Sequence, residues 1–164
     1  MPQPSGTHIS LQIAVDGHEI PSTEQIQQWS DKAIVVGGAE AKRSLNMTVR
    51  IVSEVESQDL NMRFCGQDKP TNVLAFPFDG GELPPEAGAN ELGDLAICIT
   101  VVEREAAEQS KSTESHLAHM VVHGTLHLLG YDHLNDADAE AMESRERETM
   151  QSLGFQDPYQ LELS

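Results

Sequence analysis

Cysteine and long apolar runs are both scarce in this sequence of 164 residues. The two cysteines, Cys65 and Cys98, form no C-x-x-C pair, so neither a disulfide framework nor a thiolate metal site is expected. No apolar run approaches the roughly 18 residues that a membrane-spanning helix needs. Residues 1–10 lack a basic segment followed by an apolar one, so we expect no signal peptide. The sequence therefore predicts one cytoplasmic domain covering residues 1–164.

Positive charge is also in short supply, because 10 Lys and Arg face 27 Asp and Glu, which gives a formal net charge of -17. An acidic protein repels nucleic acid at long range, and basic clusters are the usual mark of proteins that bind it. Half of the cations fall in residues 42–69, where only four acids occur. These cations are Lys42, Arg43, Arg50, Arg63 and Lys69. This segment is the one part of the chain that is not strongly acidic.

Histidine, in contrast, is concentrated, since five of the seven histidines lie between His116 and His133. Three of them, His123, His127 and His133, follow the spacing H-x3-H-x5-H. Residues four apart lie on the same face of a helix, so His123 and His127 can direct both imidazoles at one ion. Gly130 is expected to end this helix, and the turn after it lets His133 return as a third ligand.

Three neutral imidazoles form a ligand set that suits zinc, and three protein ligands leave a fourth position for water or substrate. This arrangement is typical of a catalytic zinc rather than a structural one. A single histidine on an apolar helix is usually a core residue, but three with this spacing favour a metal site. We do not expect His119, one turn earlier, to be a ligand. The helix is apolar nearly all round, which predicts that it is buried and that its histidines face a pocket.

The alternation of apolar and polar residues predicts four strands, and capping residues and glycines predict five helices. The expected strands are 9–15, 45–53, 73–78 and 95–99. The expected helices are 23–36, 54–62, 101–109, the histidine helix between Lys111 and Gly130, and 136–152, with N-caps at Ser22 or Thr23, Thr100, and Asn135 or Asp136. Residues 79–92 are expected to form a long loop. The predicted fold class is α+β, with a small mixed four-stranded sheet, about five helices and a zinc site on a buried central helix.

Three segments resemble the motifs of a known family. The sequence HGTLHLLGYDH at His123–His133 resembles the signature H-G-x-L-H-L-x-G-Y-D-H. Residues 60–77 resemble L-N-x-x-[YF]-R-G-x-D-x-P-T-[DN]-V-L-S-F-P, and residues 92–97 resemble L-G-D-[IL]-x-I. These motifs are those of the YbeY family of bacterial metallo-endoribonucleases. They occur in the right order, and the similarity covers nearly the whole chain from the second expected strand onward.

The resemblance implies a zinc-dependent endoribonuclease that cuts single-stranded RNA, matures the 3′ end of 16S rRNA and acts in ribosome quality control. It implies one Zn²⁺ per chain, held by His123, His127 and His133, which are then also the catalytic residues. The expected partners are single-stranded RNA and rRNA, small-subunit ribosomal proteins and an assembly GTPase. Neither DNA nor a membrane is an expected partner.

The sequence departs from the family pattern at two positions, with Cys65 in place of an arginine and Ala75 in place of a serine. The missing arginine leaves Arg63 and Lys69 as the candidate substrate-binding cations. If the segment is extended, Arg63 faces the same side as residue 65 and can take the arginine's place. If the segment is helical, it cannot.

Two other functions stay open at this point. A zinc protease usually has H-E-x-x-H, in which the glutamate is the general base, whereas here Gly124 follows the first histidine. The absent base argues against peptide hydrolysis. A ribosome assembly factor without enzymatic activity, in which zinc holds the fold, would suit the acidic surface, since ribosomal proteins are basic.

Overall fold

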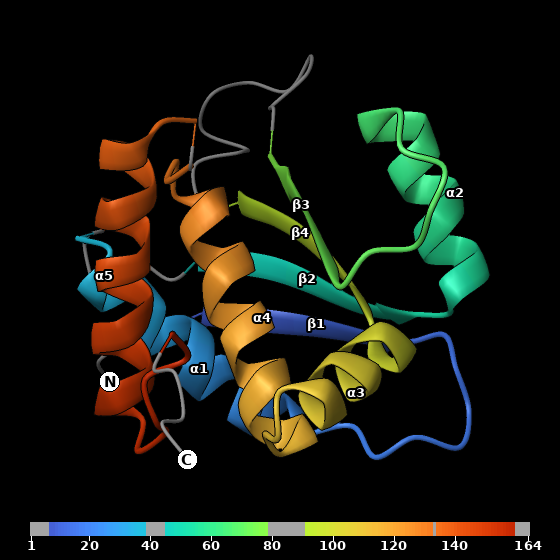
Figure 1. Cartoon of the computed structure of the whole chain (residues 1–164), viewed down its shortest axis with the longest axis horizontal. Coiled ribbons are helices and arrows are strands. Elements are labelled where there is room, and N and C mark those ends of the chain that lie inside the picture. Colours follow the sequence, from blue (N-terminus) through green and yellow to red (C-terminus); the bar gives the residue numbers. More distant parts are fainter. Residues whose placement is uncertain (1–6, 39–44, 79–90, 133, 160–164) are drawn as a thin grey trace, which may run out of the picture.

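The computed structural model describes residues 7–38, 45–78, 91–132 and 134–159 (Figure 1). A four-stranded sheet lies at its centre, in the order β1 (Thr7–Ile13), β2 (Leu45–Val52), β4 (Glu91–Cys98) and β3 (Val73–Pro77). The first three strands are parallel to one another, and β3 runs antiparallel to β4. The sheet is therefore mixed, as predicted, with β3 at one edge.

The described residues also form five helices, which confirms the predicted α+β class. They are α1 (Thr23–Val36), α2 (Glu54–Cys65), α3 (Ile99–Glu108), α4 (Thr113–Leu128) and α5 (Asp136–Ser152). Helix α4 contacts β3, β4, α1, α3 and α5, so it lies in the middle of the helical layer (Figure 1). None of the described helices combines the length and apolar character needed to cross a bilayer.

The two faces of the sheet are covered by different helices, because successive side chains of a strand point to opposite faces. Ile51, Leu95 and Ile97 belong to the main core, which includes residues of α1, α4 and α5. Ala96 belongs to a second, smaller cluster, and Leu60 of α2 packs against that cluster. Helix α4 and helix α2 therefore lie on opposite sides of the sheet.

Two N-caps follow the prediction closely. Ser22 accepts a hydrogen bond from the backbone of Gln25, whose side chain in turn accepts one from the Ser22 backbone, forming a complete capping box. Asn135 caps α5 through the backbone N–H of Asp138. These side chains satisfy backbone donors that a helix leaves unpaired at its start.

Other boundaries differ from the prediction. Strand β1 begins at Thr7, where it already pairs with Leu45 of β2. Strand β4 begins at Glu91, because its pairing with β2 extends to Asn46, so the predicted loop is shorter at its end. Residues 79–90 of that loop lie outside the described residues.

The end of α2 and the start of α3 also differ from the prediction. Helix α2 continues to Cys65 and stops at Gly66, whose φ of 70° is the left-handed conformation that favours glycine. Helix α3 begins at Ile99, directly after β4. Its N-cap is Cys98, which makes no side-chain capping hydrogen bond, so Thr100 lies inside the helix.

The buried position predicted for α4 is confirmed. Most of its residues are buried, including His116 and His119. A Cβ atom added at Gly124 would lie 2.6 Å from Leu95 Cδ2, closer than real Cβ atoms approach a neighbour. The missing side chain therefore lets the α4 backbone lie close against β4, and the histidines on either side of Gly124 are held on that fixed backbone.

Candidate metal centre

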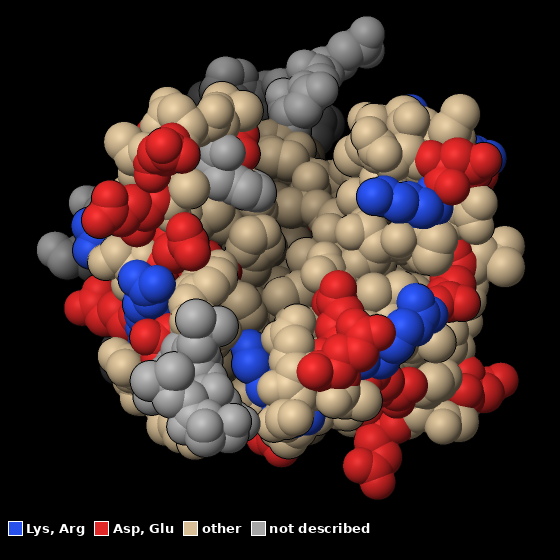
Figure 2. Space-filling view, in the orientation of Figure 1, with Lys and Arg blue, Asp and Glu red and all other residues tan. Residues whose placement is uncertain are grey.

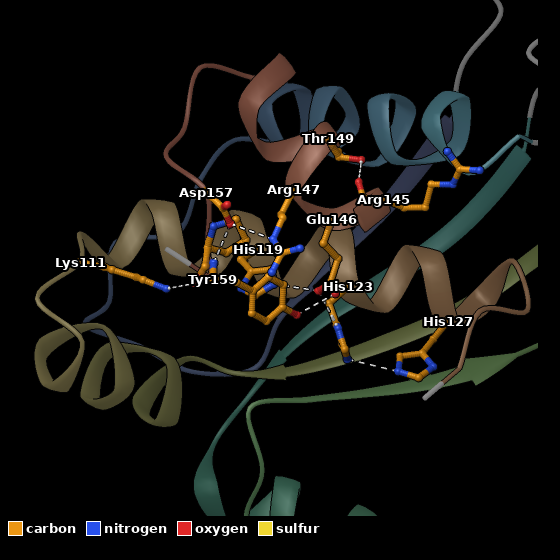
Figure 3. A network of polar contacts seen from close by, with 11 residues as sticks. Lys111, His119, His123, His127, Arg145, Glu146, Arg147, Thr149, Asp157 and Tyr159 are labelled. Carbon is orange, nitrogen blue, oxygen red and sulfur yellow. Dashed lines mark hydrogen bonds and ion pairs between the residues drawn. The ribbon is translucent and has the colours of Figure 1, made fainter. Parts of the chain in front are cut away.

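The histidines of α4 recur every three or four residues and so lie along one side of the helix. His116 and His119 are buried, whereas the His123 side chain is 22 % exposed. Figure 3 shows His119, Glu146, His123 and His127 in sequence, with His127 at one end. The Nε2 atoms of His123 and His127 lie 3.2 Å apart. The same nitrogen of both rings therefore lies on the same side, within hydrogen-bonding distance of the other.

This separation fits two ligands of one zinc ion. Imidazole nitrogens bind zinc at about 2.0–2.1 Å in tetrahedral geometry, which places two of them about 3.3 Å from each other. The observed 3.2 Å between the Nε2 atoms agrees with that value. His133, the third predicted ligand, lies outside the residues that the structure describes.

The end of α4 is closed by a regular helix-stop. Gly130 has a φ of 107°, and the backbone N–H of Tyr131 donates to the Leu126 carbonyl. This is the Schellman pattern, in which a left-handed residue reverses the chain. The Tyr131 hydroxyl then donates to the carbonyl of Gly37 at the end of α1, over 3.0 Å. The predicted glycine stop after the second histidine of the motif is therefore confirmed.

Glu146 of α5 is the carboxylate at the centre of the histidine row. It is 1 % exposed, and its Oε1 lies 2.7 Å from His119 Nε2 and 2.8 Å from His123 Nδ1. An ionised carboxylate only accepts hydrogen bonds, so both imidazole nitrogens donate to it. His123 then carries its proton on Nδ1 and keeps the Nε2 lone pair for a metal.

The ionised state of Glu146 is strongly favoured. Burial alone raises the pKa of this carboxyl, but the hydrogen bonds from His119 and His123 outweigh burial and hold its pKa at about 2. A buried charge is tolerated only when it is paired and hydrogen-bonded, and here both conditions are met. Glu146 is thus a permanent acceptor that fixes the two rings.

A second grouping of the same residues is also possible. Ligand atoms of His119, His123 and Glu146 lie within 4.8 Å of one another, so this trio could hold a metal ion. That site would use Nδ1 of His123, whereas a site shared with His127 would use Nε2. The 2.7 and 2.8 Å separations are typical of charge-assisted hydrogen bonds. The two arrangements therefore differ in which nitrogen of His123 meets the metal.

Two further polar groups surround the row. The Tyr159 hydroxyl donates to Glu146 Oε2 over 2.7 Å, and burial together with this carboxylate raises the pKa of the tyrosine. At the start of α4, His116 Nε2 lies 2.9 Å from Glu105 Oε1. Burial lowers the pKa of His116, although the hydrogen bond from its ring to Glu105 opposes the shift. His116 is therefore expected to be neutral at pH 7.

The cations predicted to bind substrate are more dispersed. Arg63 lies on α2 with a side chain that is 69 % exposed, and its Nε is 3.2 Å from Asp59 Oδ1. Lys69 is exposed and has no ion-pair partner among the described residues. Arg50 is engaged by Glu56 through two hydrogen bonds. Lys42 and Arg43 lie outside the described residues.

The helical form of α2 decides one alternative that the sequence left open. Arg63 and Cys65 are two residues apart on a helix, so their side chains point roughly 200° apart around its axis. The condition under which Arg63 takes the place of the family arginine is therefore not met. Whether Arg63 and Lys69 contact substrate stays a prediction.

Glu146 and Tyr159 were not among the site residues predicted from the sequence. A signal for Glu146 was present, because it stands four residues from both Met142 and Met150, in the buried stripe of α5. A charged residue in an apolar stripe needs a hydrogen-bonding partner. The histidines between His116 and His133 are the one cluster of such partners in the sequence. Tyr159 gave no comparable signal, since it lies beyond the last helix.

Two comparisons with known proteins match most of the chain. The model of the family described as endoribonuclease YbeY matches residues 12–154. The solution structure of TM1509 from Thermotoga maritima is similar, with a TM-score of 0.53 and 27% sequence identity. The alignment covers 92% of this chain and 99% of that protein. The family match thus includes β2, β3 and β4 together with α4 and α5.

Proposed function

Because the chain belongs to the YbeY family of endoribonucleases, an endoribonuclease role in rRNA processing is supported, and we propose its specific form. The protein is a single domain over residues 1–164 that uses one zinc ion, held by His123, His127 and His133, to cut single-stranded RNA. It matures the 3′ end of 16S rRNA and serves ribosome quality control in the cytoplasm. Small-subunit proteins and an assembly GTPase are its protein partners.

The observation that carries this proposal is the pair of Nε2 atoms 3.2 Å apart on His123 and His127. The carboxylate of Glu146 supports it, because this group binds the opposite nitrogen of His123. Metal-binding histidines commonly donate their second ring N–H to a carboxylate, which fixes the tautomer and orientation of the ring. If His119, His123 and Glu146 held the metal instead, Glu146 would bind the ion and would no longer accept the Nδ1 proton that orients the His123 ring.

The chemistry divides between the ion and the chain. Zinc, when bound, supplies an activated water at neutral pH and polarises a phosphoryl oxygen. Glu146 keeps the proton of His123 on Nδ1, and the close packing of α4 on β4 keeps the rings in place. Arg63 and Lys69 are proposed to hold RNA phosphates through their exposed side chains. Figure 2 shows a hollow between the α4 and α2 sides of the molecule, with positively and negatively charged side chains next to each other on its α2 side.

Peptide hydrolysis is not supported by the site. The position that holds the general base in H-E-x-x-H proteases is Gly124 here, and a Cβ atom at this position would lie 2.6 Å from Leu95 Cδ2, so any side chain there would require Leu95 to move. The sequence thus lacks the glutamate that serves as general base in these proteases, and the residue in its place packs against β4. The acidic surface is compatible with a nuclease that works on ribosomes, because its negative charge is complementary to basic ribosomal proteins.

Zinc-loaded protein is expected to cleave a single-stranded RNA and to leave a duplex of the same sequence largely intact. Removal of the ion with a chelator should lower the cleavage rate by more than about 100-fold, and added zinc should restore it. Cleavage products on a denaturing gel provide the measurement. The His123→Ala variant, purified in parallel, controls for contaminating ribonucleases. Cleavage by neither preparation would instead favour an assembly factor without enzymatic activity.

The Cys65→Arg substitution is expected to raise the single-turnover rate of RNA cleavage by about 10- to 100-fold. A charge-assisted hydrogen bond to a phosphate is worth about 1.5–3 kcal/mol, and each 1.4 kcal/mol corresponds to about tenfold in rate. Because Arg63 and Cys65 point apart on α2, the gain should be the same in an Arg63→Ala background. A gain that vanishes in that background would show that the two side chains act together.

A further inference from the structure

The C-terminal segment 155–159 lies against the helices that carry the metal centre. It begins at Phe155, whose ring meets the edge of Trp29 of α1 with 6.2 Å between the ring centroids. Further along, the Lys111 ammonium donates to the Pro158 carbonyl over 2.9 Å. This segment follows residue 154, the last that the family model matches. Its contacts nevertheless reach residues inside the matched region, including Lys111 and Trp29.

Arg147 of α5 binds the same segment at two points. Its Nε lies 3.4 Å from Asp157 Oδ1, and its guanidinium carbon lies 5.3 Å from the centre of the Tyr159 ring. The backbone N–H of Tyr159 also donates to Asp157 over 2.8 Å. Figure 3 shows Tyr159 held between these groups and Glu146. Arg147 and Asp157 thus hold the Tyr159 ring in position independently of the contact that its hydroxyl makes with Glu146.

Tyr159 completes the hydrogen bonding of Glu146. Both histidines bind Oε1, and the tyrosine hydroxyl is the partner of Oε2 at 2.7 Å. The tyrosine ring also meets His119 nearly at a right angle, with the ring centroids 5.4 Å apart. A buried carboxylate that is bound at one oxygen only can rotate about its last bond, and the hydroxyl removes this freedom.

We propose that Tyr159 is a positioning residue of the metal centre, acting through Glu146 on the His123 ring. The tyrosine hydroxyl fixes the carboxylate plane, the carboxylate fixes the ring, and the ring presents Nε2 to the ion. The inference rests on the proposed function, in which His123 and His127 hold zinc. It adds a contribution from the segment that follows α5, so the C-terminal residues support the site as well as the fold.

The test is the Tyr159→Phe variant, which removes the hydroxyl and keeps the ring contacts with His119 and Arg147. Zinc affinity, measured by competition with a chelator, is expected to fall about 10-fold, the lower end of the effect of losing a group behind a metal ligand. Ile26→Val, a core substitution in α1, is the matched control: it lowers thermal stability and should leave zinc affinity unchanged. In a Glu146→Gln background, Tyr159→Phe should change the zinc affinity by less than about 2-fold. The tyrosine acts on His123 only through the Glu146 carboxylate, which that background already lacks.

The imidazole ¹⁵N signals of the metal-free protein give a second readout that does not depend on zinc. Tyr159→Phe should shift the His123 signals, and Ile26→Val should not. Wild-type affinity together with unchanged His123 signals in Tyr159→Phe would overturn the inference and leave the proposed function standing. If wild-type protein takes up no zinc, the proposed function fails, and the His123 signals still decide whether Tyr159 positions the ring.

Discussion

His127→Ala is expected to lower both the affinity for zinc and the rate of RNA cleavage, each by more than about 100-fold. The substitution removes one of the two nitrogens that lie 3.2 Å apart, and losing a ligand should exceed the 10- to 100-fold effect of losing a group behind a ligand. His127 lies near the end of α4 and is only partly buried, so the fold should survive the change. Metal content after gel filtration and single-turnover cleavage are the measurements.

His119→Ala is the matched variant, because it separates the two possible metal groupings. If zinc is held by His123, His127 and His133, His119→Ala keeps a full equivalent of zinc, with affinity reduced by the loss of one hydrogen bond to Glu146. If zinc is held by His119, His123 and Glu146, His119→Ala loses it and His127→Ala keeps it. The opposite pattern of retention would thus refute the three-histidine site. Thermal unfolding of both variants shows whether either loss merely reflects unfolding.

The spacing of histidines was readable from the sequence because it obeys a local rule. Residues four apart on a helix face the same way, so His123 and His127 had to lie together once α4 formed. The same local rules gave the caps at Ser22 and Asn135 and the stop at Gly130. Strand ends were less predictable, because pairing with a neighbour such as β2 sets where β4 begins.

The groups behind the histidines depend on tertiary packing, which no local pattern encodes. Glu146 reaches His119 and His123 only because α5 packs against α4. Tyr159 reaches Glu146 only because the chain turns back after α5. The direction of Arg63 relative to Cys65 depended on whether α2 extends to residue 65, and helix ends are set by single residues such as Gly66. The sequence therefore predicted that His123 and His127 lie together, whereas the positions of Glu146 and Tyr159 beside them depend on the packing of α5 and the segment after it.

Glu146→Ala is expected to lower the free energy of unfolding of the metal-free protein by about 3 kcal/mol. The substitution removes the acceptor that buried donors of His119, His123 and Tyr159 share, and a buried donor left without its acceptor costs about 1–3 kcal/mol. At the size of this domain, about 3 kcal/mol corresponds to a fall in Tm of roughly 6–12 °C. Glu146→Gln keeps the shape and one acceptor, so its loss of stability should be about half as large. Urea unfolding of both variants at pH 7 gives the values.

The same substitutions should weaken zinc binding by about 10- to 100-fold, because His123 loses the carboxylate that fixes its Nδ1 proton. Glu148→Gln is the matched control, since this acid lies on the same helix with a side chain that is 60% exposed. Its only ion pair among the described residues is with Arg145 at 3.8 Å, and such surface pairs contribute less than about 1 kcal/mol. A Glu146→Gln variant that is less stable yet binds zinc as tightly as the wild type would restrict Glu146 to a structural role. If Glu146→Gln instead binds zinc more weakly while its stability is nearly unchanged, the buried Glu146 carboxylate serves mainly to orient the zinc ligands and not to stabilise the fold.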